Sequence, residues 1–170
     1  AKATFITSIG NDKYGKILKK LLKENNIRYL TLNREDLETT RKIRVVSQNQ
    51  QLIRLDFNRY VKSDSNLFAL ESFKEEIDKH DLVIISDYDY GGQLNTKEMI
   101  RIARNKNKTV IVDPKFKDFE NYYGANIITP NIKELINVVG IWKSEAELEE
   151  MVLNLRKKYE IVKNLSYWDI

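Results

Sequence analysis

The stretch Leu82-Val83-Ile84-Ile85-Ser86-Asp87 decides the expected fold. Four apolar residues in a row are typical of a strand buried on both faces, as in parallel sheets that helices cover. Two further runs have the same form: Thr109-Val110-Ile111-Val112-Asp113 and Asn126-Ile127-Ile128-Thr129-Pro130-Asn131. Segments with helical periodicity surround these runs. The sequence therefore predicts an α/β layered fold with a largely parallel central sheet flanked by helices.

Apolar residues at helical spacing predict the helices. One begins after a cap at Asn11-Asp12 and presents Tyr14, Ile17, Leu18, Leu21 and Leu22 on a single face; others cover about 63–80, 131–139 and 144–159, and one follows Asn95. An Asn or Ser followed three residues later by Glu predicts a capping box. This pattern occurs at Asn95 and Glu98, at Asn131 and Glu134, and at Ser144 and Glu147.

Residues 42–57 follow a different pattern. Two runs with alternating apolar and polar residues lie on either side of the polar segment Gln48-Asn49-Gln50. This arrangement predicts a β-hairpin at about 40–57. Because Arg44, Arg54 and Asp56 occupy its second face, we expect a two-faced antiparallel element and not a core strand.

Composition excludes several classes of protein. The chain has 170 residues, with 29 Lys and Arg against 25 Asp and Glu, a net charge of +4, and no Cys. Without Cys there is no disulfide-stapled domain and no thiolate metal site, and no apolar run reaches the roughly 18–20 residues of a membrane span. Basic and acidic residues are interspersed, which argues against a nucleic-acid-binding protein. We expect one domain over residues 1–170, in the cytoplasm, without a membrane partner.

Polar residues follow each of the three apolar runs. If the strands are parallel neighbours, Asp87, Asp113, Lys115 and Asn131 share one edge of the sheet, where ligands of open α/β folds bind. Carboxylate and amide oxygens suit Mg²⁺ and a Lys suits phosphate, a combination that phosphoryl transfer requires. The structural alternative is that turns begin at strand ends. Asn131 and Glu134 likewise have the spacing of a helix cap, and that interpretation stays open beside a ligand role.

Several phrases of the sequence occur together in one family. They are Gly10-Asn11-Asp12-x-x-Gly15, the segments 39–45 and 48–56, Ser86-Asp87-Tyr88-Asp89-Tyr90-Gly91, Asp113-Pro114-Lys115, and Thr129-Pro130-Asn131-x-x-Glu134. In this order they resemble the heptose 7-phosphate kinase domain of bacterial ADP-heptose synthases, which is a ribokinase-like (PfkB) carbohydrate kinase. Segment 48–56, Gln-Asn-Gln-Gln-Leu-Ile-Arg-Leu-Asp, is the phrase most specific to the heptose branch.

The resemblance implies a ribokinase-like fold with the hairpin as a lid. It implies an enzyme that transfers a phosphoryl group from ATP, with Mg²⁺, to O1 of D-glycero-D-manno-heptose 7-phosphate, for ADP-heptose and lipopolysaccharide synthesis. It also implies a homodimer formed through the hairpin. Carried over by position, the implied residues are Lys42, Arg44, Asn49, Gln50, Gln51 and Asp87 for the sugar phosphate, Asp113, Lys115 and Asn131 for the nucleotide, and Asn131 and Glu134 for the metal.

The sequence also departs from the family pattern. Tyr90 stands where the family has Lys, Gln48 where it has Arg, and Phe116 where it has Gly. The Gly-x-Gly-Ala-Gly-Asp-type segment, which supplies the anion hole and the catalytic Asp, has no counterpart, and neither has the amino-terminal sugar-binding segment. We therefore expect an incomplete kinase domain with weak or no activity alone, and we assign no catalytic residue. The alternative is a non-catalytic remnant or dimerisation module of the same fold.

Overall fold

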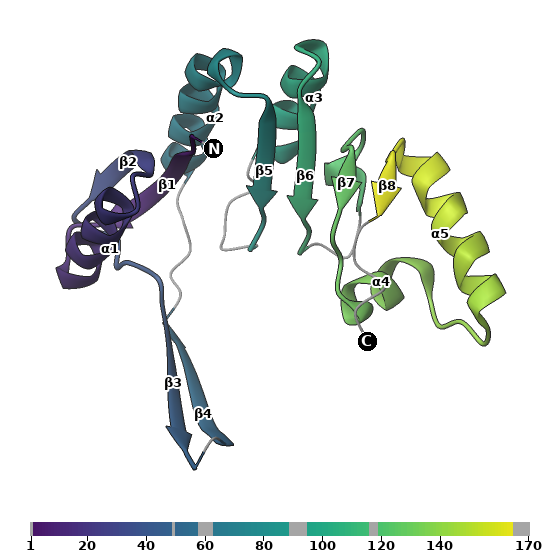
Figure 1. Ribbon diagram of the computed structural model, residues 1–170, viewed down its shortest axis with the longest axis horizontal. Helices are drawn as coiled ribbons and strands as arrows, with labels where there is room; N and C mark the ends of the chain where they lie inside the picture. Colours follow the sequence, from purple (N-terminus) through teal and green to yellow (C-terminus); the bar gives the residue numbers. More distant parts are fainter. Residues whose placement is uncertain (1, 49, 58–62, 89–94, 116–118, 165–170) are drawn as a thin grey trace. The chain divides into compact units, whose positions relative to one another are not determined.

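The computed structural model describes residues 2–48, 50–57, 63–88, 95–115 and 119–164 (Figure 1). The chain forms two compact units. Unit 1 comprises Ala1–Ser72 with Tyr90–Gly92, and unit 2 comprises Phe73–Asp89 with Gln93–Ile170. The border between them falls within helix α2 (Ser63–Glu76). That residues 1–170 act as a single domain stays a prediction.

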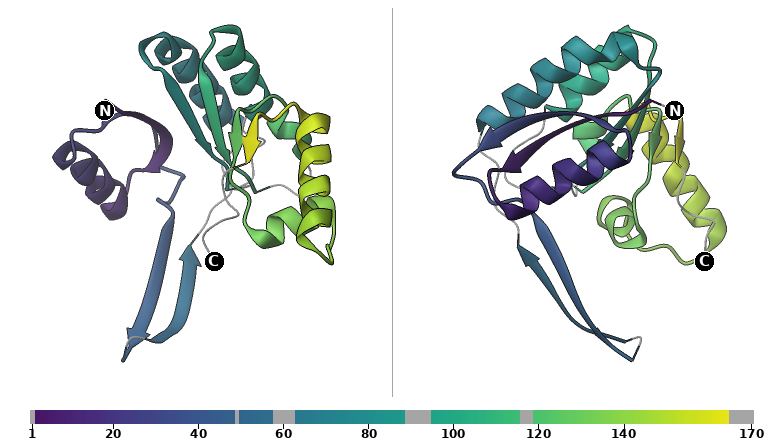
Figure 2. Two further views of the ribbon diagram at one scale, coloured as in Figure 1. Left: turned by 45° about the vertical axis from the view of Figure 1, so that its right-hand side comes forward. Right: turned by 60° about the vertical axis from the view of Figure 1, so that its left-hand side comes forward.

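Unit 1 begins with a strand–helix–strand element formed by β1 (Thr4–Gly10), α1 (Lys13–Glu24) and β2 (Arg28–Arg34). The two strands pair in parallel, and Figure 2 shows α1 lying along the pair. Asp12 caps α1 as predicted, since its carboxylate accepts the backbone N–H of Gly15 at 2.7 Å. The predicted apolar face of α1 is only partly buried, because Leu22 is buried whereas Ile17 and Leu21 are exposed.

The second part of unit 1 is the hairpin of β3 (Arg41–Ser47) and β4 (Gln50–Phe57), which confirms the predicted element at about 40–57. The strands are antiparallel, with a register shift between Val45 and Val46. In the turn, Gln48 adopts a left-handed backbone with φ +46°. The hairpin is not a core element, as expected, but both of its faces are exposed, whereas alternation is typical of one packed and one solvated face.

Unit 2 contains a four-stranded parallel sheet in the order β5 (Leu82–Ser86), β6 (Thr109–Asp113), β7 (Ile127–Ile128) and β8 (Lys163–Asn164). The three predicted apolar runs are its first three strands, so the α/β class with parallel strands is confirmed. β8 was not predicted, because two residues are too short to show any periodicity. Its backbone pairing with β7 depends on tertiary structure alone.

The end of α2 belongs to unit 2. The helices that lie wholly in unit 2 are the short 3₁₀ segments η1 (Ile77–Lys79) and η2 (Phe119–Tyr122), together with α3 (Thr96–Asn105), α4 (Ile132–Val139) and α5 (Glu145–Tyr159). The core lies between these elements and the sheet. Its completely buried side chains include those of Ile100, Val110, Val112, Phe119, Tyr122 and Ile128. The rings of Phe119 and Tyr122 meet edge to face, with centroids 5.6 Å apart.

The structure corrects the prediction that strand 82–85 is buried on both faces. Ile85 is buried, whereas Leu82 is 45% and Ile84 is 68% exposed. β5 is the edge strand of its sheet, and only the face that bears Ile85 is packed. A continuous apolar run thus indicated a strand correctly but overstated how much of it is covered.

Two of the three predicted capping boxes are also corrected. Asn95 makes no side-chain cap bond to α3, and the Glu98 carboxylate accepts from the guanidinium of Arg101, so neither half of the box forms. Ser144 accepts the N–H of Glu147, but the Glu147 carboxylate turns to the N–H of Lys143, so only half of the box forms. The box at Asn131 and Glu134 is complete. Ionic or neighbouring backbone partners compete for a Glu that the spacing alone assigns to the cap.

Candidate active site at the carboxyl ends of the parallel strands

The parallel register brings the ends of β5, β6 and β7 to one edge of the sheet. Ser86 pairs with Asp113, and Val112 pairs with Ile128. The backbone N–H of Asp87 continues this pairing by donating to the carbonyl of Asp113 at 3.0 Å. The residues that follow the strands therefore start from the same edge, where open α/β sheets bind their ligands.

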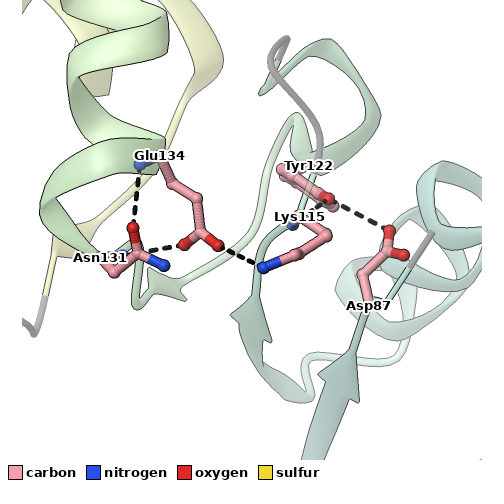
Figure 3. Close-up of polar contacts among 5 residues, drawn as sticks. All are labelled: Asp87, Lys115, Tyr122, Asn131 and Glu134. Carbon is pink, nitrogen blue, oxygen red and sulfur yellow. Dashed lines mark hydrogen bonds and ion pairs between the residues drawn. The ribbon is translucent and has the colours of Figure 1, made fainter. Parts of the chain in front are cut away.

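A buried tyrosine hydroxyl joins two of these strand ends (Figure 3). The hydroxyl of Tyr122 donates to Asp87 Oδ2 at 3.1 Å and accepts the backbone N–H of Lys115 at 3.0 Å. Asp87 is only 2% exposed. The predicted substrate residue Asp87 thus points into unit 2, where its carboxylate is held by hydrogen bonding.

The side chain of Lys115 continues the network to α4. Its Nζ lies 3.1 Å from Glu134 Oε1, and Figure 3 shows the two side chains pointing toward each other. Glu134 Oε2 accepts the backbone N–H of Asn131 at 2.9 Å, and Asn131 Oδ1 accepts that of Glu134 at 3.0 Å. The helix-cap interpretation of this pair is therefore correct. The half-exposed ammonium of Lys115 is the cationic group of this network that solvent reaches.

The donor set fits a hydrated Mg²⁺ better than a directly chelated one. No group of three or more His, Cys, Asp or Glu that could hold a metal ion occurs in the described ranges. Both oxygens of Glu134 already accept one partner, yet a carboxylate offers about four acceptor positions. Mg²⁺ in nucleotide sites keeps several waters and uses only one or two carboxylates. Asn131 and Glu134 could hold such an ion through its water ligands.

The predicted sugar-phosphate residues lie on the hairpin of unit 1. Lys42 pairs across the strands with Asp56, and Arg44 lies directly opposite Arg54. Arg54 Nη2 contacts Asp56 Oδ2 at 2.7 Å. This hydrogen bond, with the charges of Arg54 and its neighbours, lowers the pKa of the Asp56 carboxyl. With Lys42, Arg44 and Arg54 against Asp56, the polar face carries more positive than negative charge.

The other predicted hairpin residues lie near its tip. Gln51 pairs with Val46 and Gln50 with Ser47, and both glutamines are exposed. Asn49 lies outside the described residues, as do Tyr90 and Phe116, at which the sequence departs from the family pattern.

Sequence reasoning brought together most of the network but missed its centre. Asp87, Asp113, Lys115 and Asn131 were predicted to share one edge, with Glu134 as a cap or ligand residue, and contacts now connect them. The sequence pattern assigns Tyr122 no role in this site. No spacing rule points to its hydroxyl. The available signal is only that a tyrosine needs a partner for its O–H when it is buried.

Solved structures define the class of the fold. A possible 1-phosphofructokinase from Thermotoga maritima superposes with a TM-score of 0.79 at 19% identity, covering 99% of this chain and 55% of that one. Ribokinase from Giardia lamblia superposes with a TM-score of 0.68 at 16% identity, covering 91% and 49%. The protein therefore has a ribokinase-like α/β fold. In the described part of the chain, no helix has the length and apolarity to cross a membrane.

Sequence comparison identifies the family. The pattern of the pfkB family carbohydrate kinases matches residues 1–165, and the chain belongs to that family. The bifunctional protein HldE of Blochmanniella pennsylvanica is 37% identical over 166 residues, which are 98% of this chain and 34% of that protein. HldE of Actinobacillus pleuropneumoniae is 39% identical over 156 residues, covering 90% and 32%. The chain thus spans about a third of the length of these relatives.

Proposed function

We propose that this chain is the sugar-phosphate-binding and nucleotide-binding part of a heptose 7-phosphate kinase. The reaction is transfer of the γ-phosphoryl group of ATP to O1 of D-glycero-D-manno-heptose 7-phosphate, in the cytoplasm, toward ADP-heptose and lipopolysaccharide. The observation that carries the proposal is the Lys115–Glu134–Asn131 network at the carboxyl edge of a parallel sheet. Segment 48–56 and the similarity to HldE proteins support the heptose branch over other sugars.

The nucleotide would bind at this edge in unit 2. Phosphoryl transfer depends mainly on positioning and on stabilising charge at the phosphate oxygens. The ammonium of Lys115 is exposed enough to meet those oxygens, and Asp113 lies beside it at the end of β6. Asn131 and Glu134 would hold hydrated Mg²⁺, which when bound neutralises charge on the phosphates. Asp87 contributes through its bond to Tyr122, which holds the backbone of Lys115.

The 7-phosphate of the sugar would bind to the polar face of the hairpin. Arg44 and Arg54 are directly opposite each other, and like charges in such a cross-strand pair destabilise it. A phosphate bound by these guanidinium groups and by Lys42 would relieve the repulsion through charge-assisted hydrogen bonds. The amides of Asn49, Gln50 and Gln51 would serve the sugar hydroxyls. The proposal includes no general base, so we expect binding with little or no turnover by the chain alone.

Calorimetric titration of the chain with Mg²⁺–ATP and with heptose 7-phosphate tests the two sites separately. Lys115→Met should weaken Mg²⁺–ATP binding about tenfold, or about 1.4 kcal/mol, while Lys133→Met, an exposed lysine on α4, should not. Arg44→Met should weaken only the sugar phosphate. Failure of the folded chain to bind either ligand at millimolar concentration would refute the proposal. A coupled ADP-release assay that gives the rate of a full-length kinase would refute the expectation of low activity.

An exposed apolar face on the hairpin favours the proposed homodimer. Ile43, Val45, Ile53 and Leu55 lie on the face opposite to Arg44, and each is more than 40% exposed. Pairing with the hairpin of a second copy would remove this surface from water. Sedimentation equilibrium should show a dimer that Ile53→Lys converts to monomer. Val46→Lys, on the other face, should leave it dimeric. A monomeric wild-type chain would contradict this arrangement and also the alternative of a dimerisation module.

A further inference from the structure

The open end of the hairpin is held by one arginine. Arg41 begins β3 and pairs with Phe57 at the end of β4. Its guanidinium lies over the ring of Phe57 and over the ring of Tyr14 in α1, at 4.5 Å from each ring centroid. Arg41 Nη2 also lies 3.6 Å from Glu38 Oε2. Arg41 therefore connects both ends of the hairpin to helix α1 through cation–π contacts.

A second set of contacts holds the chain just before Arg41. The backbone N–H of Thr39 donates to Asp12 Oδ2 at 2.8 Å, while Asp12 Oδ1 accepts the N–H of Gly15 at 2.7 Å. The Thr39 hydroxyl in turn accepts the N–H of Gly10 at 3.1 Å. One carboxylate thus joins the start of α1 to the residue that leads into the hairpin. Thr39 is buried, so water does not compete freely for these bonds.

The approach of the two segments leaves no free space. A Cβ on Gly10 would lie 2.2 Å from the carbonyl oxygen of Leu37 and 2.8 Å from the nitrogen of Thr39. A Cβ on Gly15 would lie 3.1 Å from the Thr39 hydroxyl. Segment 37–39 is therefore packed directly on the turn between β1 and α1.

We call Arg41 and segment 37–39 the root of the hairpin. Beyond this root, every described residue of the hairpin is exposed. A strand of this length extends about 20 Å, so a rotation of about 10° at the root would move the tip by about 4 Å. The contacts of Asp12, Thr39 and Arg41 are consequently in a position to set the direction of the whole hairpin.

We propose that Arg41 is a positioning residue that fixes the direction of the hairpin relative to α1. It does so together with the hydrogen bonds of Asp12 and Thr39 described above, which we call the Asp12–Thr39 clamp. The guanidinium of Arg41 is engaged by two rings and by Glu38. Arg41 therefore orients the neighbouring cations and does not bind the ligand itself. That consequence for ligand binding rests on the proposed function, whereas the orienting role does not.

Pulsed electron paramagnetic resonance measures this direction without any ligand. The chain has no Cys, so Lys20→Cys on α1 and Ser47→Cys near the hairpin tip, both exposed, give one pair of spin labels. The labelled chain with no further substitution should give one narrow distribution of distances between the two labels. Arg41→Lys keeps the charge but loses the planar stacking, and we expect it to widen the distribution about twofold. Arg54→Lys on the exposed part of β4 is the matched control and should not.

The clamp is tested in the same labelled chain. Thr39→Val removes the acceptor for the Gly10 N–H and should also widen the distribution, whereas Thr39→Ser keeps the acceptor and should not. Circular dichroism and the unfolding midpoint separate a change of direction from a loss of folding. If Thr39→Val does not fold, Arg41→Lys decides. A wild-type distribution as wide as that of Arg41→Lys, or one that this variant leaves unchanged, would overturn the proposal.

The effect on ligand binding is a separate measurement. In calorimetry, Arg41→Lys should weaken heptose 7-phosphate binding several-fold and leave Mg²⁺–ATP binding unchanged. Absence of sugar-phosphate binding by the wild-type chain would refute the proposed function and leave the distance result standing. Arg41→Lys could widen the distance distribution and still leave sugar-phosphate binding normal. That result would show that hairpin direction does not govern affinity, and it would overturn the claim that Arg41 orients the ligand-binding cations.

Discussion

Tyr122 donates its hydroxyl hydrogen to the carboxylate of Asp87 at 3.1 Å, and the same oxygen accepts the backbone N–H of Lys115 at 3.0 Å. One oxygen atom therefore connects the residues that follow two neighbouring parallel strands. Tyr122 is completely buried and Asp87 almost so, so water is poorly placed to replace a lost bond. The position of Lys115 at the edge of the sheet depends on this interior contact.

Tyr122→Phe should destabilise unit 2 by about 1–3 kcal/mol. The ring and its packing on Phe119 remain, but Asp87 loses a donor and the Lys115 N–H loses an acceptor. Equilibrium unfolding in urea measures the change. Tyr123→Phe is the matched control, because its hydroxyl bonds an exposed carboxylate, that of Glu160, and we expect a smaller loss. Equal losses for the two variants would contradict the importance of the buried oxygen.

The capping box of α4 gives a second prediction. Asn131→Ala removes the acceptor for the Glu134 N–H and should cost about 1 kcal/mol of unfolding free energy. Ser144→Ala at the start of α5 removes only half of a box and should cost no more. Hydrogen exchange should locate each loss in the first turn of its own helix. Faster exchange throughout α4 and α5 in both variants would show that the caps do not act locally.

The Asp12 clamp predicts a dependence on pH. Burial raises the pKa of Asp12, but the backbone hydrogen bonds from Thr39 and Gly15 outweigh it and hold the pKa below 3.8. The pKa of Asp12 is therefore lower in the folded than in the unfolded protein. The contribution of the Asp12 carboxylate to stability is complete above about pH 4 to 5 and is lost as the pH falls through the folded pKa. Asp12→Asn should remove this part of the acid dependence. The free energy of unfolding is measured against pH for the wild-type chain and for Asp12→Asn. Identical slopes in the two proteins would contradict this prediction.

Gly10→Ala should be among the most destabilising single substitutions in unit 1. Its Cβ would meet backbone atoms of Leu37 and Thr39, which cannot rotate away, and we expect a loss of about 3 kcal/mol or more. Gly140→Ala meets no neighbouring atom, but Gly140 has φ +90° and ψ −175°, a region that other residues rarely adopt, so strain alone should cost about 1–3 kcal/mol. Thermal unfolding compares the two. A smaller loss at Gly10 than at Gly140 would show that segment 37–39 can move away.

Periodicity predicted the elements better than it predicted their burial. The hairpin and the strands β5, β6 and β7 were located because alternation and apolar runs are local features of the sequence. The exposure of Ile84 was not, because it depends on which neighbours cover the edge strand. The candidate site followed from the rule for strand ends, yet the role of Tyr122 depends on a contact across 35 residues of sequence. The competition of Arg101 for Glu98 likewise could not be read from the capping pattern.

The ion pair of Lys115 and Glu134 also has a consequence for the charge at this edge of the sheet. Glu134 already has a positive neighbour supplied by the chain itself, at 3.1 Å. Lys115 thus acts as an internal counter-ion, which keeps the carboxylate compensated before any ligand arrives. If Glu134 holds hydrated Mg²⁺ as proposed, its carboxylate would be shared between the waters of that ion and Lys115, whose ammonium could also contact the phosphates. Because Lys115 offsets the charge of Glu134, the phosphates of a nucleotide would meet little uncompensated negative charge at the start of α4.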